Sequence, residues 1–170
     1  MAITFRKIAS VTVGVGGTST IEFTSIPQIY TDLQLLISTR EESTGYAEIF
    51  LKFNNTTSNL ATRWLRGTGT SISAGTTANL QLLGNSSISG ANTFSNVSFY
   101  IPNYTGSNYK SAMSDSVVEN NVSNSPDVFQ NIAAHLWSNT AAVSQITLFL
   151  TSDDIAEHST ATLYGISSTI

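Results

Sequence analysis

Apolar and polar residues alternate along almost the whole chain. The alternation is clearest in segments 32–38, 47–53, 97–101 and 146–151, where apolar side chains recur at every second position. Alternate side chains of an extended strand share one face of a sheet, so a period of two predicts strands that bury one face. The chain is therefore expected to be all-β.

The best-defined segments also predict which side chains are buried. The residues expected to face inward are Leu33, Leu35, Ile37, Ile49, Leu51 and Phe53, with Glu48 and Lys52 facing outward. The charged segment 40–45 lies between these two strands and is expected to be a loop in solvent. Segment 67–77 is rich in Gly, Ser and Thr, which favours a loop or a loosely paired edge strand.

The N-terminal part of the chain predicts a hairpin. Alternating valines occupy 11–15, and Gly16 and Gly17 then precede the short apolar segment 21–23. Glycine adopts positive φ without steric cost, so two glycines between extended segments favour a tight turn. The two segments are therefore predicted to pair with each other.

One segment also fits a helix. Val128, Ile132 and Leu136 recur every four residues behind Asp127, a residue type favoured at helix N-termini. We prefer a strand over 132–137, because the neighbouring segments are strands and strand preference depends on context. The helix remains the alternative from the residues alone. In the strand interpretation, Ile132, Ala134 and Leu136 lie on the face opposite Ala133, His135 and Trp137.

The pattern as a whole predicts about nine or ten strands, and the length suits a single domain spanning 1–170. So many antiparallel strands must pair or cover their edges. A single-domain antiparallel β-sandwich of jelly-roll type does this in a chain of this size. We therefore predict that architecture.

Composition narrows the functional classes. Only 11% of the 170 residues are charged and the formal net charge is −4, whereas Ser and Thr contribute 48 residues and Asn a further 14. The surface must therefore consist largely of hydroxyls and amides. Binding to a phosphate backbone needs several Lys or Arg on one face, and the sequence has no basic cluster. Nucleic acid is not an expected partner.

Two further classes are disfavoured by what the sequence lacks. It has no cysteine, which excludes disulfides and thiolate metal sites. No apolar run approaches the roughly 18 residues that span a bilayer, and the first residues lack the apolar stretch of a secretory signal. We expect a chain that starts in a cytoplasm and does not bind membranes.

The chain offers few groups for catalysis. Its two histidines are His135 and His158, and the first alternates within a predicted strand, where a hydrogen-bonded structural imidazole is the ordinary interpretation. The sequence contains no Gly-x-Ser-x-Gly nucleophile motif. We therefore expect no enzyme activity and no cofactor.

An acidic loop is a weak candidate for a metal site. Asp153, Asp154 and Glu157 carry carboxylate oxygens of the kind that Ca²⁺ prefers. The loop has neither EF-hand spacing nor a flanking glycine, so a solvated loop is the preferred interpretation.

Aromatic side chains supply the candidate binding residues. Tyr100, Tyr104 and Tyr109 lie on a strand end and the loop after it, together with Asn103 and Asn108. Tyrosine rings that stack on sugars beside amides that bond hydroxyls would form a glycan platform, and tyrosines also favour protein interfaces. Ordinary packing at the rim of a sandwich is the alternative. Trp64 is a further interface candidate.

Strand and turn patterns over nearly the full chain resemble virion structural proteins of tailed bacteriophages, especially those of cyanobacterial and aquatic hosts. The resemblance implies a non-enzymatic β-sandwich displayed on the virion surface and assembled in the host cytoplasm. It carries over no functional residues. The segments that carry it are 7–14, 21–33, 64–69, 99–104, 146–148 and 160–166.

Within that resemblance two roles are open. The first is a capsid decoration or cement protein that binds the major capsid protein or other virion proteins, expected as a homotrimer that grips the shell near Trp64 or Tyr104. The alternative is a tail-fibre or host-receptor module that binds a surface glycan. Predicted strands begin near Met1 and end near Ile170, leaving no room for a fibre shaft, so decoration is favoured.

Overall fold

The computed structural model of the chain describes residues 2–42, 48–83, 92–120, 128–150 and 152–169, and these contain twelve strands and no helix. Accordingly, this part of the chain has no helix of the length and hydropathy that a membrane span requires. The strands are β1 (Ala2–Thr12), β2 (Thr20–Phe23), β3 (Asp32–Thr39), β4 (Glu48–Phe53), β5 (Leu60–Gly67), β6 (Ile72–Thr77), β7 (Leu80–Leu83), β8 (Ser95–Ile101), β9 (Lys110–Val118), β10 (Phe129–Trp137), β11 (Ile146–Leu150) and β12 (Thr160–Thr169).

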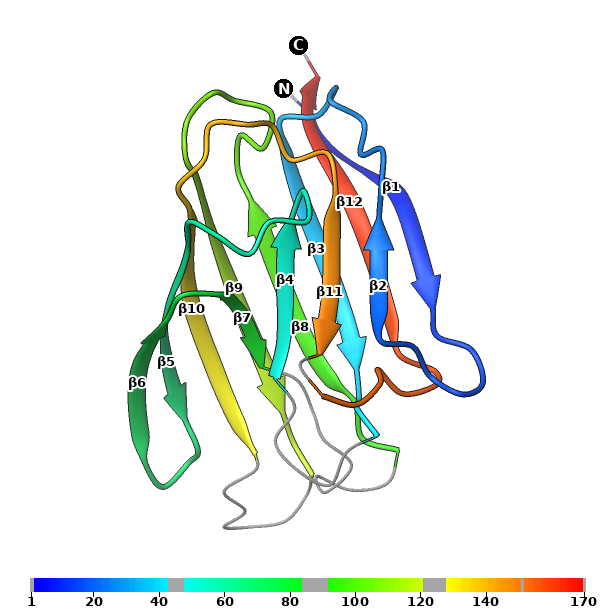
Figure 1. The fold of residues 1–170 in the computed structure, drawn as a ribbon, viewed down its shortest axis with the longest axis vertical. Helices are drawn as coiled ribbons and strands as arrows, with labels where there is room; N and C mark the ends of the chain where they lie inside the picture. The colour runs from blue at the N-terminus through cyan, green and yellow to red at the C-terminus, as the bar shows by residue number, and fades with distance from the viewer. Residues whose placement is uncertain (1, 43–47, 84–91, 121–127, 151, 170) are drawn as a thin grey trace.

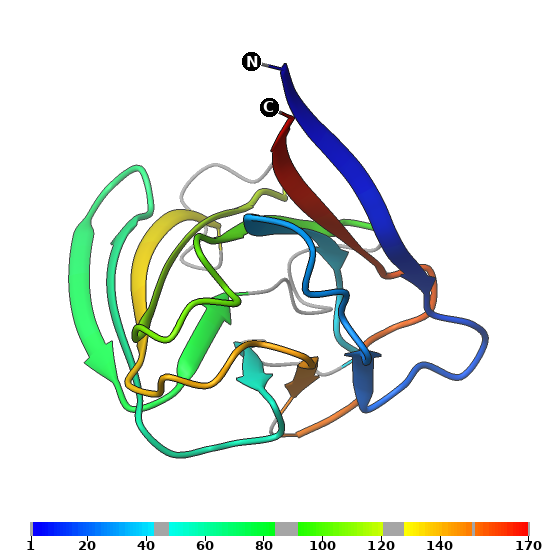
Figure 2. The same cartoon turned by 90° about the horizontal axis from the view of Figure 1, so that it is seen from above.

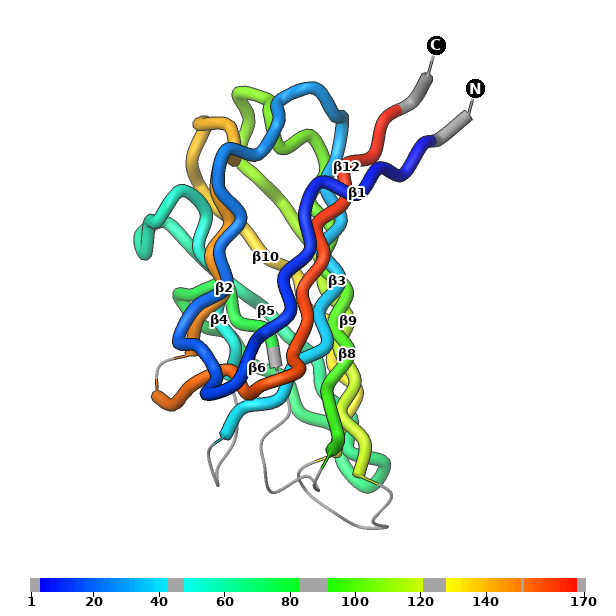
Figure 3. The backbone as a smooth tube through the Cα atoms, turned by 90° about the vertical axis from the view of Figure 1, so that its right-hand side faces the viewer, coloured from blue at the N-terminus to red at the C-terminus, as the bar shows by residue number. Residues whose placement is uncertain are grey.

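The strands form two antiparallel sheets of unequal width that face each other (Figure 1). The large sheet has eight strands in the order β1-β12-β3-β8-β9-β10-β5-β6, and the small sheet has four in the order β2-β11-β4-β7. Seen from above, the large sheet curls around at its β5-β6 end (Figure 2). At the other end, β1 and β12 carry both termini away from the body as a two-stranded ribbon (Figure 3).

The path of the chain confirms the predicted jelly-roll sandwich. If β5-β6 and β9-β10 are set aside, successive strands alternate between the large and the small sheet, except that β4 and β7 follow each other and pair within the small sheet. This is the double Greek key of a jelly roll. The two remaining pairs extend the large sheet beyond β8. We call these four strands, β9, β10, β5 and β6, the extension. The structure has more strands than the nine or ten expected, because segment 72–77 forms a paired edge strand and β7 was not predicted.

The predicted N-terminal hairpin is wrong. β1 pairs with β12 in the large sheet, whereas β2 pairs with β11 in the small sheet. Gly16 and Gly17 do turn the chain with φ of +88° and +71°, but the turn carries it from one sheet to the other. A local turn signal cannot reveal which sheet the next strand joins, and Val15 at the turn is 90% exposed.

The core between the sheets agrees with the predicted inward faces. All six of the inward residues expected on β3 and β4 are at most 2% exposed. β8 adds Val97, Phe99 and Ile101, and β11 adds Ile146 and Leu148, all of them fully buried. Pro102 follows the last residue of β8, as expected of a residue without a backbone donor.

The helical alternative for the segment before Trp137 is also excluded. β10 is hydrogen-bonded to β9 on one side and to β5 on the other, and its side chains alternate strictly between buried and exposed. The two neighbouring strands supply the context that decides between the two periodicities.

Gly165 on β12 provides a test of the packing. A Cβ at this position would overlap the ring of Tyr30, whereas a Cβ at Gly14 would meet nothing within 4 Å. We expect Gly165→Ala to lower the free energy of unfolding by about 1–3 kcal/mol, because the ring or the strand must shift. Gly14→Ala is the control and should be nearly neutral. Denaturant unfolding measures both, and equal effects would contradict the close contact.

Candidate functional site

Tyr104 is not available to a ligand, which corrects the prediction that it belongs to a glycan platform. Its ring is fully buried and its hydroxyl donates a hydrogen bond to the carbonyl oxygen of Pro27. The backbone N–H of Tyr30 donates to the same hydroxyl at 3.4 Å. Burial raises the pKa of the Tyr104 phenol. The residue therefore ties the loop after β8 to the segment before β3.

The other two tyrosines lie apart from it. Tyr100 is half-buried on the outer face of β8, and its hydroxyl donates to Asp32 Oδ2 at 2.8 Å. Burial, reinforced by this carboxylate, raises the pKa of Tyr100. Tyr109 is 60% exposed at the end of the following loop. The three tyrosines thus do not form a single platform, and Tyr109 alone among them presents most of its ring.

Trp64 faces inward from β5. It lies opposite Gly75 of β6, and its ring fills the space that a Cβ on Gly75 would occupy. The guanidinium carbon of Arg66 lies 5.0 Å from the centre of the indole ring. Trp64 therefore packs β6 against β5. Its half-buried ring does not project into solvent, as a side chain that binds the capsid shell would.

The acidic loop does not gather a metal site. Asp153 is exposed with φ of +67°, and Asp154 accepts a backbone hydrogen bond from Glu42 through its main-chain oxygen at 3.3 Å. Glu157 lies 3.6 Å from the imidazole of His158. Within the ranges that the structure describes, no three His, Asp or Glu side chains come together as ligands.

His135 is a buried titratable group on the inner face of the extension. Its Nδ1 lies 2.8 Å from Thr62 Oγ1, and its Nε2 lies 2.8 Å from Ser114 Oγ. The ring centre is 5.0 Å from that of Phe99. Burial lowers the pKa of His135 to about 4, so the imidazole is neutral at pH 7. With 2% exposure and two hydroxyl partners, it joins β9, β10 and β5 rather than facing a substrate.

A buried lysine performs a similar structural task at the top of the extension. Lys110 is 1% exposed, and its Nζ donates to the main-chain oxygens of Gly106 and Asn108, both at 2.6 Å. Burial lowers its pKa. The ammonium group thereby closes the loop that precedes β9.

The outer face of the extension has the opposite character, because large aliphatic side chains project from it into solvent. They are between 37% and 80% exposed. A folded chain of this size rarely exposes so many large apolar side chains together unless a partner covers them. We call this surface the extension face. Its apolar residues are Leu65, Ile72, Met113, Val117, Ile132 and Leu136.

Only two charged side chains lie on the extension face, and they have opposite signs. Asp115 projects from β9 and lies opposite Ile132, whereas Arg63 projects from β5 and lies opposite Ala134. Neither makes an ion pair within the residues that the structure describes. Both charges therefore remain free to pair with a partner.

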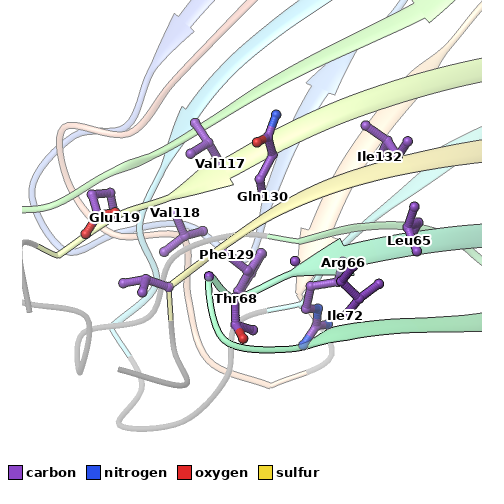
Figure 4. A pocket seen from close by; sticks show the side chains of 13 residues that line it. Leu65, Arg66, Thr68, Ile72, Val117, Val118, Glu119, Phe129, Gln130 and Ile132 are labelled. Carbon is purple, nitrogen blue, oxygen red and sulfur yellow. The ribbon is translucent and has the colours of Figure 1, made fainter. Parts of the chain in front are cut away.

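A hollow of about 550 Å³ continues the face at the lower end of the extension. Its walls combine Leu65, Val117 and Ile132 of the extension face with Phe129 and the turn after β5, as Figure 4 shows. Arg66 and Glu119 bring a charge of each sign to its rim. The surface is thus contoured as well as apolar.

Sequence reasoning did not identify this face. Along β10 the outward and the inward positions both mix large apolar and polar side chains, so neither set identifies the solvent side. One feature of the sequence could have indicated the face: these strands are rich in aliphatic residues and contain almost no charged ones.

Comparisons of the chain with protein-family models and with curated proteins give no match.

The His135 cluster predicts a specific pH dependence. The pKa of His135 is about 4 in the folded protein, against 6.5 for an exposed histidine. Between these values the unfolded chain binds more protons, so stability falls as pH decreases, by about 3 kcal/mol in total for this group. We expect His135→Gln to remove this part of the loss between pH 7 and pH 4 in denaturant titrations.

His158→Gln is the matched control, because the side chain of His158 is 77% exposed. It should leave the slope of stability against pH unchanged. An identical slope for wild type and His135→Gln would contradict the assignment.

Proposed function

We propose that this chain is a non-enzymatic structural protein of a bacteriophage particle, and that it acts as a decoration protein on the head. The observation that carries the proposal is the extension face, a broad surface of exposed aliphatic side chains on an otherwise hydroxyl-rich protein. Such a surface binds protein rather than transforming a small molecule.

The distribution of titratable groups favours the same role. His135 is enclosed between two hydroxyls, and the acidic loop residues lie apart from it on another element. Acid–base catalysis needs such groups within reach of one substrate. The two buried side chains His135 and Lys110 serve packing and loop closure instead.

The jelly-roll architecture supports the proposal at the level of analogy, since sandwiches of this type recur in viral capsid domains and lectins. The two sequence-based roles differ in what they need from the surface. A decoration protein needs a broad face for contacts with protein subunits of the particle, further copies of itself included, and the extension supplies such a face, whereas a glycan-binding module needs exposed rings beside amides. Among the three candidate tyrosines, Tyr109 has the exposed ring that keeps the second role as an alternative.

Locating the protein in intact particles tests the proposed role. We expect many copies distributed over the head, seen by cryo-electron microscopy, and particles deprived of the protein should lose their genome at lower temperature than particles to which it is added back. A few copies confined to the tail would support the fibre alternative. The lack of any copies in the virion would refute both.

A substitution at Tyr109 separates the alternative from the main proposal. If the exposed ring stacks on a host glycan, Tyr109→Ala should reduce adsorption to host cells at least about tenfold, as expected for losing a stacking contact in a small site. Tyr109→Phe keeps the ring and serves as the control. For a decoration protein we expect both variants to adsorb like wild type.

A further inference from the structure

The extension face carries a charge pattern that is complementary to itself. Asp115 and Arg63 lie on opposite sides of β10, next to Ile132 and Ala134 respectively, which are two residues apart on that strand. The two charges therefore occupy diagonal corners around an apolar centre. No other charged side chain projects outward from β9, β10, β5 or β6.

We propose that a second copy of this chain binds the extension face, related by a twofold axis that passes between Ile132 and Ala134. This inference names the partner of the face and rests on the binding role proposed for it above. In the twofold pair, Arg63 of each copy faces Asp115 of the other. Both ion pairs form at once because the same patch is used on each side.

Sheet geometry shows that the apolar residues also match. The axis that exchanges the two charges lies in the interface plane, perpendicular to the line that joins them. With strands about 4.8 Å apart and a rise of about 3.3 Å per residue, the strands of the two copies then cross at roughly 70°, near the orthogonal class of sheet packing. Leu65 of one copy lies over Ile132 of the other, and Met113 lies over Ala134.

The pattern favours a twofold pair over the trimer expected from the sequence. A ring of three copies needs two different patches on each subunit that fit each other. The exposed apolar residues outside the extension include Phe5, Val15 and Ile29, which lie on separate elements. The large apolar cluster is a single patch, which suits an interface in which each copy contributes the same surface.

A foreign protein surface would explain exposed aliphatic residues but not their arrangement. Such a partner needs no balance of charge within the patch, because it can supply either sign itself. Here one cation and one anion flank the apolar centre, and neither has an ion-pair partner within the described part of the chain. A second copy satisfies both with no further requirement.

Charge reversal tests the pairing in the purified full chain. Sedimentation velocity over the micromolar range should show wild-type dimers. Asp115→Arg places two arginines opposite Arg63 groups, and Arg63→Asp places aspartates opposite Asp115, so each variant alone should dimerise at least about tenfold more weakly. Glu22→Arg and Lys7→Asp change the net charge equally at exposed positions away from the face, and should dimerise like wild type.

Mixing the two weakened variants is the decisive measurement. A heterodimer of Asp115→Arg with Arg63→Asp regains two opposite-charge contacts, so an equimolar mixture should recover dimers that neither variant forms alone. A wild type that stays monomeric, a trimer, or a mixture that fails to recover dimers would overturn the proposal. A monomer that nevertheless coats the head would overturn this inference while leaving the decoration role intact.

Discussion

The unequal width of the two sheets is the constraint on which the rest of the structure depends. The first four strands of the large sheet, from β1 to β8 in sheet order, belong to the jelly roll, whereas the small sheet has only four strands to face all eight. The extension therefore cannot bury its inner face against a complete second sheet. β7, at the edge of the small sheet, lies against β5, β9 and β10, and the remaining contacts must come from the extension itself.

The chain meets this constraint in part with buried polar side chains that form hydrogen bonds. Burying a hydroxyl or an imidazole without a hydrogen-bond partner costs about 1–3 kcal/mol, so most such groups are paired. Ser116 Oγ and Asn131 Oδ1 on the inner face of the extension have no hydrogen-bond partner within the described residues. His135 bonds to Ser114 and Thr62, and Lys110 bonds to two main-chain oxygens. The aromatic ring of Trp137 packs on Phe53 where the extension joins the core.

The consequence is a sheet segment in which both faces mix polar and apolar side chains. Ser114, Asn131 and His135 point inward beside Phe129 and Trp137, whereas Met113, Val117, Ile132 and Leu136 point into solvent. This mixture also marks how far the sequence could predict the structure. The period of two identified the jelly-roll strands and the buried faces of β3 and β4, where one face is plainly apolar. It could not assign faces in β10, where both sets are mixed, nor show that the hydroxyl of Tyr104 would reach Pro27 across 77 residues.

The buried polar cluster and the extension face are linked through strand register. The hydrogen bonds of His135 connect β10 directly to Thr62 on β5 and diagonally to Ser114 on β9, which helps to fix the alignment of the three strands. A shift of one residue in any of them would exchange its inward and outward side chains. It would turn Arg63 or Asp115 into the interior and remove the diagonal pair around Ile132 and Ala134. The same imidazole that stabilises the inner face therefore determines the pattern that the outer face presents to a partner.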